Sequence, residues 1–160
     1  MRLVIQRVKQ ASVTVYTEGH EYDEQFVEHH AAIGNGLMIL VGVEETDSET
    51  DIDWLVGKVS GMRIFDDENG VMNLSVKDID GELMAISQFT LFASTKKGNR
   101  PSWLRAAKGN ISEPLYDLFC AKLSTLTGKN VARGVFGADM KVNLINDGPV
   151  TIIIDSKNKE

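Results

Sequence analysis

The sequence contains almost no cysteine, since Cys120 is the only one among its 160 residues. A single cysteine excludes an internal disulfide bond, and no second Cys or His stands beside it at the spacing of metal ligands. A chain without disulfide bonds suits a reducing compartment. We therefore expect a cytoplasmic protein in which the Cys120 thiol packs in the core.

Long apolar runs are also missing. The longest, at 37–43, is far shorter than the ~20 residues that a membrane-spanning helix requires. No positively charged segment followed by a long apolar stretch opens the chain. With 160 residues, 42% of them hydrophobic, the chain suits one domain with a proper core. The sequence predicts a soluble single domain over 1–160 with no membrane partner, in which 156–160 form a flexible tail.

Histidine is scarce and confined to one stretch. His20, His29 and His30 lie in the polar segment 17–30, which we expect to be a surface insertion in a hairpin rather than a site. A serine or threonine that attacks an ester normally needs a base within hydrogen-bond reach. Metal ligation is not indicated either, because no cluster of His, Cys, Asp and Glu has ligand spacing. We expect no metal ion and no other cofactor.

Two segments have the apolar periodicity of helices. The first spans 51–62, with Asp47 and Ser48 available as caps. The second spans 112–127, with Ser112 as its cap, Pro114 in its first turn and Gly128 at its end. The apolar stripes are Ile52, Leu55, Val56, Val59 and Met62 in the first helix, and Leu115, Leu118, Phe119, Leu123 and Leu126 in the second. Each stripe should pack on a sheet.

Strand-like segments occupy much of the remaining chain. They are rich in β-branched and apolar residues, and turn signals stand at Asn69-Gly70 and Asp80-Gly81. The predicted strands are 2–8, 12–16, 37–43, 83–92, 140–146 and 150–155. The class is therefore α/β, with a mixed or mostly antiparallel sheet.

Two short motifs about sixty residues apart stand at the ends of predicted strands. The first, Ser87-Gln88-Phe89-Thr90-Leu91, belongs to a predicted buried strand, so the hydroxyls of Ser87 and Thr90 should lie on opposite faces. The second, 146–151, reads Asn-Asp-Gly-Pro-Val-Thr, and its Gly-Pro pair is a constrained turn ahead of a strongly β-prone segment. We expect one of the two hydroxyls to reach a pocket.

Both motifs resemble those of the D-aminoacyl-tRNA deacylase family, or D-tyrosyl-tRNA(Tyr) deacylase family. The resemblance covers roughly the whole chain, because further segments are similar in the same order: 1–8, 36–44, 63–65, 96–102 and 134–140. It implies a single domain with barrel-like, mostly antiparallel sheets and two main helices. It also implies a homodimer with its active sites at the subunit interface.

The resemblance implies an editing hydrolase that cleaves the ester of D-aminoacyl-tRNA, and that of mischarged glycyl-tRNA, to give free tRNA. An aminoacyl ester is already activated, so the site has only to orient water, stabilise the oxyanion and hold the ester. In the family, the stretch that matches Ser87, Gln88, Phe89 and Thr90 binds the aminoacyl group and the terminal ribose. The 2′-hydroxyl of the substrate is thought to assist, and Thr90 as a covalent nucleophile is the less favoured alternative.

The family also implies how chirality is read. Its Gly-Pro pair, here Gly148-Pro149, is cis, reaches into the partner subunit's pocket and excludes the side chain of an L-amino acid with its carbonyls. The counterpart of Arg7 packs near that pair and fixes its geometry. Residues matching Phe136, Gly137, Ala138 and Met140 line the adenosine end of the pocket, where an aromatic face and small residues suit a base.

From the residues alone, each of these assignments has a plain structural alternative. Ser87 and Thr90 could be satisfied by the backbone in a core strand, and a strand arginine such as Arg7 is more often a solvated edge charge. The bond before Pro149 is ordinarily trans. The segment 136–140 could be a glycine-containing turn that places Phe136 and Met140 in the core.

A net charge of −6 argues against a broad RNA-binding surface. A local basic patch could still meet the few phosphates at a tRNA 3′ end, although a charged surface loop is an equal alternative. The patch comprises Lys96, Lys97, Arg100, Arg105 and Lys108. The chain departs from the family in the long segment 17–30 and in Trp103, where phenylalanine is expected. Two other functions remain open: a general hydrolase of small esters, and a non-enzymatic dimeric module that binds nucleotides or aminoacyl-adenosine.

Overall fold

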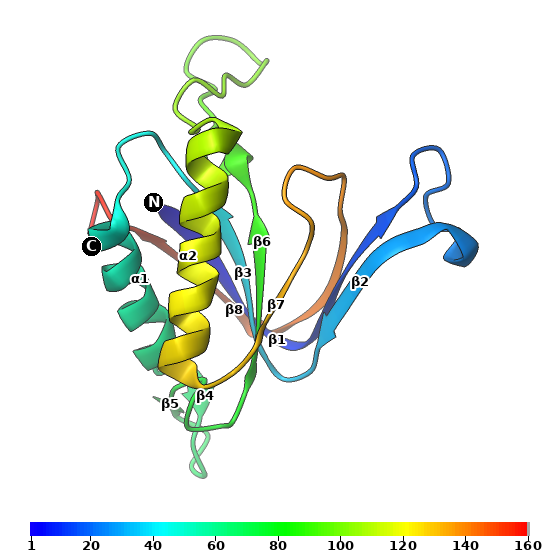
Figure 1. Ribbon diagram of the computed structural model, residues 1–160. Helices are drawn as coiled ribbons and strands as arrows, with labels where there is room; N and C mark the ends of the chain where they lie inside the picture. Colours follow the sequence, from blue (N-terminus) through cyan, green and yellow to red (C-terminus); the bar gives the residue numbers. More distant parts are fainter. Residues whose placement is uncertain (160) are drawn as a thin grey trace.

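A curved mixed sheet with two helices on one face forms the single domain (Figure 1). The computed structural model describes residues 1–159. Its elements are β1 (Arg2–Tyr16), the 3₁₀ helix η1 (Glu24–Phe26), β2 (Val27–Ile33), β3 (Gly36–Gly42), α1 (Glu49–Gly61), β4 (Phe65–Asp66), β5 (Met72–Leu74), β6 (Glu82–Ser87), the 3₁₀ helix η2 (Phe89–Phe92), α2 (Gly109–Thr127), β7 (Val131–Arg133) and β8 (Lys141–Asp155).

The main sheet has the order β2-β1-β3-β6-β7, and β8 pairs with β1. β1 is antiparallel to β2, β3 and β8, whereas β3, β6 and β7 run parallel to one another. Because β1 has 15 residues, its first half pairs with β3 and its second half with β2. The sheet bends along this long strand into a nearly closed barrel, and β4 and β5 form a separate two-stranded ribbon.

Several predicted strand boundaries are wrong. The segments 2–8 and 12–16 are one continuous strand, as are 140–146 and 150–155, because register shifts beside 7–10 absorb the irregularities without breaking the pairing. The predicted strand 83–92 ends at Ser87, after which the chain turns into η2. The predictions also missed β2, β4, β5 and β7.

Helix α1 begins two residues before the predicted start at 51, because Ser48, one of the two predicted caps, is its N-cap in a capping box with Asp51. Asp47 has another role, since its carboxylate binds the Met1 ammonium and accepts a 2.8 Å bond from the Glu44 amide. Of the predicted stripe, Ile52, Leu55, Val56 and Val59 are buried.

The start of α2 was predicted wrongly. Lys108 is the N-cap, so Ser112 lies within the helix, where its hydroxyl donates to the Lys108 carbonyl at 3.0 Å, and Pro114 lies beyond the first turn. Leu126 is exposed, and Tyr116 and Cys120 occupy the buried face with Phe119 and Leu123. Gly128 ends the helix in the left-handed conformation, as predicted.

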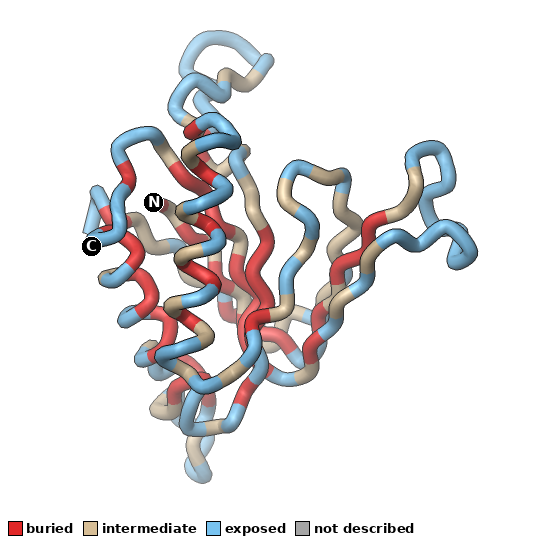
Figure 2. The backbone as a smooth tube through the Cα atoms, in the orientation of Figure 1, coloured by how far each residue is buried: buried red, intermediate tan, exposed pale blue. Residues whose placement is uncertain are grey.

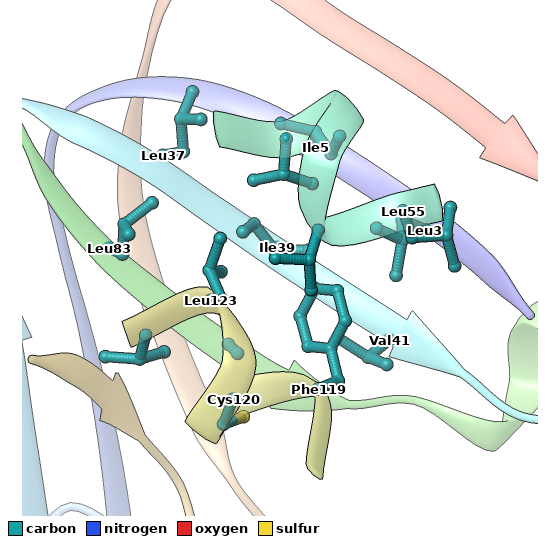
Figure 3. Packing of buried hydrophobic residues seen from close by; sticks show 14 of the residues in the cluster. Leu3, Ile5, Leu37, Ile39, Val41, Leu55, Leu83, Phe119, Cys120 and Leu123 are labelled. Atoms are coloured by element: carbon teal, nitrogen blue, oxygen red, sulfur yellow. The ribbon is translucent and has the colours of Figure 1, made fainter. Parts of the chain in front are cut away.

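Two apolar clusters lie on opposite faces of the sheet. The larger one joins both helices to β1, β3 and β6, and Figure 3 shows Leu55 of α1 beside Leu3 of β1 in this cluster. Cys120 belongs to this cluster, which confirms the prediction that its thiol packs in the core. The smaller cluster, which includes Met38, Met84 and Ile86, fills the concave face. The buried segments of Figure 2 follow these two faces.

The polar segment 17–30 is only partly a loop. Residues 17–26 form the tip of the β1–β2 hairpin, where His20 stacks on Phe26 at 3.9 Å between ring centroids. His29 and His30 lie in β2 instead. The His29 Nε2 atom lies 2.7 Å from the Arg133 carbonyl of β7, and this contact bridges the seam of the barrel.

The segment predicted as a flexible tail, 156–160, begins with two anchored residues. The Met1 ammonium donates to the buried Ser156 hydroxyl at 2.8 Å, and the Lys157 ammonium donates to Asp51 at the same distance. Residue 160 lies outside the described residues. None of the helices in 1–159 is long and apolar enough to cross a membrane.

Candidate active site

A cavity of about 310 Å³ opens where β6 ends. Its walls come from the ends of β3 and β6, from α2 and from the segment that leads into β8. The structure brings seven of the eleven predicted site residues together in this wall: Ser87, Gln88, Phe89, Phe136, Gly137, Ala138 and Met140. Thr90, Arg7, Gly148 and Pro149 lie elsewhere.

The first motif lies at the carboxyl end of a parallel strand, where ligands of α/β sheets commonly bind. Ser87 pairs with Val41 at the end of β6, and the Gln88 amide donates to the Val41 carbonyl at 2.8 Å. Gln88 then leaves the strand with φ −144° and ψ 86°, and Phe89 begins η2. The motif thus bends around the mouth of the cavity instead of continuing through the core.

Thr90 lies on the other side of this bend. The prediction that its position follows strand alternation is wrong, because the residue belongs to η2. It lines a second, separate depression together with Arg2 and Leu91. Its hydroxyl accepts a hydrogen bond from the side-chain amide of Gln88, and through this bond Thr90 contacts a residue that lines the cavity.

The opposite wall is the loop 134–140, and its shape depends on two glycines. Gly137 adopts φ +76°, in the left-handed region that favours glycine. A Cβ atom on Gly134 would lie 2.3 Å from the Met140 sulfur, so this position has no room for a side chain unless Met140 moves. Phe136 packs at a tilt on Tyr116 of α2, with 6.0 Å between the ring centroids. The loop therefore presents Phe136 and Met140 to the cavity.

Few titratable groups line the cavity. The Tyr116 hydroxyl donates to the Ala85 carbonyl at 2.8 Å, and its pKa is raised by burial and by the neighbouring Cys120, so the phenol stays neutral. Burial also raises the pKa of the Cys120 thiol, to about 11. Among residues 1–159, Asp139 is the only carboxylate of the lining, and it is paired with Lys141 at 2.6 Å. No histidine from this part of the chain lines the cavity. The arrangement offers positioning and polarisation but no obvious base.

Metal ligands are not assembled here. Within residues 1–159, no three His, Cys, Asp or Glu side chains form a group that could hold a metal ion. In the acidic run 66–68, Asp66 ends β4, and Asp67 accepts bonds from the Asn69 and Val71 amides of the turn that follows.

Arg7 is buried, and its guanidinium contacts the backbone around the second motif. It donates to the Ile64 carbonyl at 2.7 Å and to the Asp147 carbonyl at 3.3 Å, and ion pairs of 3.4 and 3.3 Å join it to the carboxylates of Asp66 and Asp147. Its side chain is 7% exposed, which excludes the alternative of a solvated edge charge. Arg7 thus ties the residue before Gly148 to β1.

Gly148 and Pro149 lie in an irregular part of β8 beside Arg7. The peptide bond between them is cis, and Gly148 has φ +124°, a conformation that L-residues rarely adopt. A Cβ atom on Gly148 would lie 2.8 Å from the Val150 amide and 3.3 Å from the Arg7 guanidinium. The pair is therefore closely confined by its own chain.

The second motif is remote from the cavity of its own chain. Gly148 lies beside Arg7 of β1, Arg7 pairs with Leu37 of β3, and Leu37 pairs with Leu83 of β6. Along the strand direction, Gly148 is therefore at the level of Leu83, which lies four residues before Ser87. Three inter-strand steps also separate β8 from β6. With strand spacings of about 4.8 Å and a rise of about 3.3 Å per residue, the separation along the sheet is on the order of 20 Å. Neither Gly148 nor Pro149 lines the cavity of its own chain.

Sequence reasoning missed several residues of the cavity. Tyr116 and Ala107 line it. Tyr116 could have been found only if the face that α2 turns toward the sheet had been predicted correctly. Asp139 lies inside the predicted segment and was passed over. No local pattern marks Ala107, which reaches the cavity because its amide bonds to the Val43 carbonyl at 2.9 Å.

Known proteins share the sequence and the fold of this chain. The family model described as D-Tyr-tRNA(Tyr) deacylase matches residues 4–155. A D-aminoacyl-tRNA deacylase of Bacteroides fragilis (strain YCH46) is 61% identical over 160 residues, and one of Dechloromonas aromatica (strain RCB) is 58% identical; each comparison covers 100% of both chains.

A solved structure, the c-Myc DNA Unwinding Element Binding Protein, superposes with a TM-score of 0.83 at 36% identity, over 97% of this chain and 98% of that chain. A structure described as a probable eukaryotic D-amino acid tRNA deacylase gives a TM-score of 0.77 at 17% identity, over 96% and 97% of the two chains, and supports the fold alone. The chain belongs to the D-Tyr-tRNA(Tyr) deacylase family.

Proposed function

We propose that this protein hydrolyses the ester of D-aminoacyl-tRNAs to free tRNA and D-amino acid, as an editing enzyme of the cytoplasm. The observation that carries the proposal is the cavity at the end of β6, where the motif at Ser87 faces the loop 134–140 in a chain of this family. A volume of about 310 Å³ lies within the range of small-ligand sites and suits the terminal aminoacyl-adenosine rather than the body of a tRNA.

The chemistry follows from what the cavity contains. The first amides of a helix have no intrahelical acceptor, so the Phe89 N–H group at the start of η2, which borders the cavity, is a candidate to bind the developing oxyanion. Ser87 and Gln88 would hold the aminoacyl group and the ribose. Because the ester is activated, water oriented by the site and by the substrate 2′-hydroxyl is sufficient as nucleophile. Thr90 as a covalent nucleophile is disfavoured, since its hydroxyl accepts a bond from Gln88 and faces the second depression.

At the other end of the cavity, Phe136 and Met140 offer apolar surface for the adenine, and Gly137 and Ala138 leave room for it. Adenine has a flat face that stacks on aromatic side chains. This assignment places the reacting ester at the β6 end and the base beneath the loop 134–140.

Chirality would be read by Gly148-Pro149 of a second copy. The separation on the order of 20 Å within one chain supports a homodimer in which each copy supplies this pair to its partner's cavity. Arg7 holds the Asp147 carbonyl and so fixes the direction of the pair. Carbonyls that face the α-carbon reject an L side chain, whereas D-amino acids and achiral glycine remain acceptable, so glycyl-tRNA is also a substrate of the proposed site.

The test is deacylation of D-tyrosyl-tRNA beside L-tyrosyl-tRNA by the purified protein, with and without a chelator. The proposal expects rapid loss of the D-ester alone, indifferent to the chelator, and loss of activity in Phe136→Ala. A matched control is Val71→Ala, which removes an exposed apolar side chain far from the cavity. Equal hydrolysis of both esters and of simple model esters would instead indicate a general esterase.

One observation favours a second candidate, a dimeric module that binds aminoacyl-adenosine without turnover. The cavity lining within 1–159 contains a neutral Tyr116 and a paired Asp139, and no free base. Such a module would bind a non-hydrolysable D-aminoacyl-adenosine analogue, yet release no amino acid from the ester in a single-turnover assay.

A further inference from the structure

A stretch beside the cavity differs in charge from the rest of the molecule. None of the chain's 23 acidic residues falls between 83 and 112, although the net charge is −6. The same stretch contains Lys96, Lys97, Arg100, Arg105 and Lys108. Arg105 is paired with Glu44 at 3.2 Å, and the other four cations form no ion pair within residues 1–159. Positive charge is therefore concentrated at one place on an acidic protein.

The structure presents three of these cations on a small hairpin. Ser94 and Ser102 exchange two backbone hydrogen bonds of 2.8 Å, which close the base, and residues 95–101 form the tip. Lys96, Lys97 and Arg100 are exposed on that tip. In Figure 1 the loop projects beyond the ends of β6 and α2, and Figure 2 shows it as solvent-exposed along most of its length.

An aromatic pair joins the base of this hairpin to the cavity. Trp103 follows the base directly and packs edge-on against Phe89, with 5.4 Å between the ring centroids and 74° between their planes. Phe89 lines the cavity, yet 55% of it is exposed, and Trp103 is 41% exposed. Exposed aromatic surface next to unpaired cations is the combination that binds single-stranded nucleic acid, because bases stack on the rings and phosphates meet the charges.

We propose that Trp103 and the basic hairpin form a subsite for the single-stranded nucleotides that precede the terminal adenosine of tRNA. The inference rests on the proposed function, in which the cavity takes that adenosine. Trp103 stacks on a base, and Lys96, Lys97 and Arg100 contact phosphates further from the ester. The subsite explains how an acidic protein holds an RNA end without a broad basic surface, and it predicts tolerance of tRNA identity because stacking is sequence-tolerant.

Binding is tested first, without catalysis. The chain has two tryptophans, so Trp54→Phe leaves Trp103 as the only tryptophan reporter. Titration with the trinucleotide CCA should quench its fluorescence saturably, whereas Trp103→Phe, which retains only Trp54, should show no quenching. Unchanged Trp103 emission at concentrations where CCA binds, or no binding of CCA at all, would overturn the subsite.

Kinetics separate the subsite from the cavity. Replacing an aromatic residue that stacks on a base with alanine weakens binding by about 5- to 150-fold. Trp103→Ala should therefore lower kcat/KM for D-tyrosyl-tRNA by a factor in this range. The same variant should leave 3′-O-D-tyrosyl-adenosine, which lacks the preceding nucleotides, unchanged, and Trp103→Phe should restore most of the loss. Equal losses on both substrates would assign Trp103 to the shape of the cavity instead. Failure of the wild type on both esters would contradict the proposed function, whereas CCA quenching would still decide the subsite.

The charges are tested through salt. A single-strand phosphate contact contributes about 0.7 to the slope of log K against log salt, so Lys96→Ala with Lys97→Ala should reduce the slope for CCA-ended tRNA by about 1.4. Lys77→Ala, an exposed lysine outside the hairpin, is the matched control and should leave the slope unchanged. An unchanged slope in the double variant would remove the phosphate contacts from the proposal.

Discussion

Arg7 shows how one buried side chain determines the geometry of a remote motif. Its guanidinium donates hydrogen bonds to two backbone carbonyls, those of Ile64 and Asp147. Hydrogen bonds to charged groups contribute about 1.5–3 kcal/mol each, and unpaired buried polar groups are costly. Arg7 therefore links stability to the placement of Gly148.

We expect Arg7→Met to lower the free energy of unfolding by about 2–4 kcal/mol, because the carbonyls lose a charged donor. The same change should weaken discrimination, so that the ratio of D- to L-tyrosyl-tRNA hydrolysis falls while activity on the D-ester persists. Urea unfolding and the two deacylation rates measure these effects. Lys9→Met is a control, since Lys9 is exposed and binds only the Asp147 carboxylate; an equal loss of selectivity in that variant would contradict a role for the carbonyl contact.

At the scale of single elements, the first turn of α1 is joined to the C-terminal segment. The Asp51 carboxylate accepts bonds from the Ser48 amide at 2.9 Å and from the Lys157 ammonium at 2.8 Å. Burial acts to raise the pKa of Asp51, but hydrogen bonds from Lys157, Ser156 and Ser48 outweigh it and hold the pKa well below its usual range. The ionised form is thus the one that holds the turn.

This depressed pKa sets the direction of a pH dependence. The contribution is fully present above the unfolded value of about 3.9 and is lost as the pH falls through the lower folded value. At pH 7, Asp51→Asn should cost about 1 kcal/mol, as for other capping residues, and lower Tm by about 2–4 °C. The difference from the wild type should shrink below pH 4. Thermal unfolding of both proteins at several pH values measures it, with the exposed Glu45→Gln as control; a Tm difference that persists at low pH would contradict the assignment.

Element positions also show where sequence reasoning succeeds. Gly128 and Ser48 were predicted correctly because caps and left-handed glycines are local signals. The turn after Ser87 was missed, since a run of apolar and hydroxyl residues has the same pattern whether the strand continues or gives way to η2. The predicted start of α2 was wrong because serine is a favoured N-cap residue, which made Ser112 the apparent cap. The helix begins earlier, after Lys108, where the hydrogen bond between the Ala107 amide and the Val43 carbonyl holds the chain.

For the whole molecule, the fold class, the two helices and the family could be obtained from the sequence, whereas the long-range geometry could not. Nothing in the sequence around Ser87 or Gly148 states that the two lie on different levels of the sheet, three strands apart. That separation depends on the pairing of β1 with β3 and β8, which is set by contacts between distant segments. It is also the strongest argument for a site shared between two copies.

The shared site is tested by mixing two variants. Pro149→Ala loosens the selective pair and should hydrolyse both D- and L-tyrosyl-tRNA, whereas Phe136→Ala has an intact pair but should lack a working cavity. In an equal mixture after subunit exchange, the intact cavities are those of the Pro149→Ala chains. In a two-fold dimer, about half of these chains have a Phe136→Ala partner, which supplies an intact Gly148-Pro149 to their cavity. Hydrolysis of the L-ester should then fall to about half, and in a tenfold excess of Phe136→Ala to about one tenth, while hydrolysis of the D-ester persists. If the pair acted within its own chain, added Phe136→Ala protein would leave the L-ester rate unchanged, and the dimeric site would be wrong.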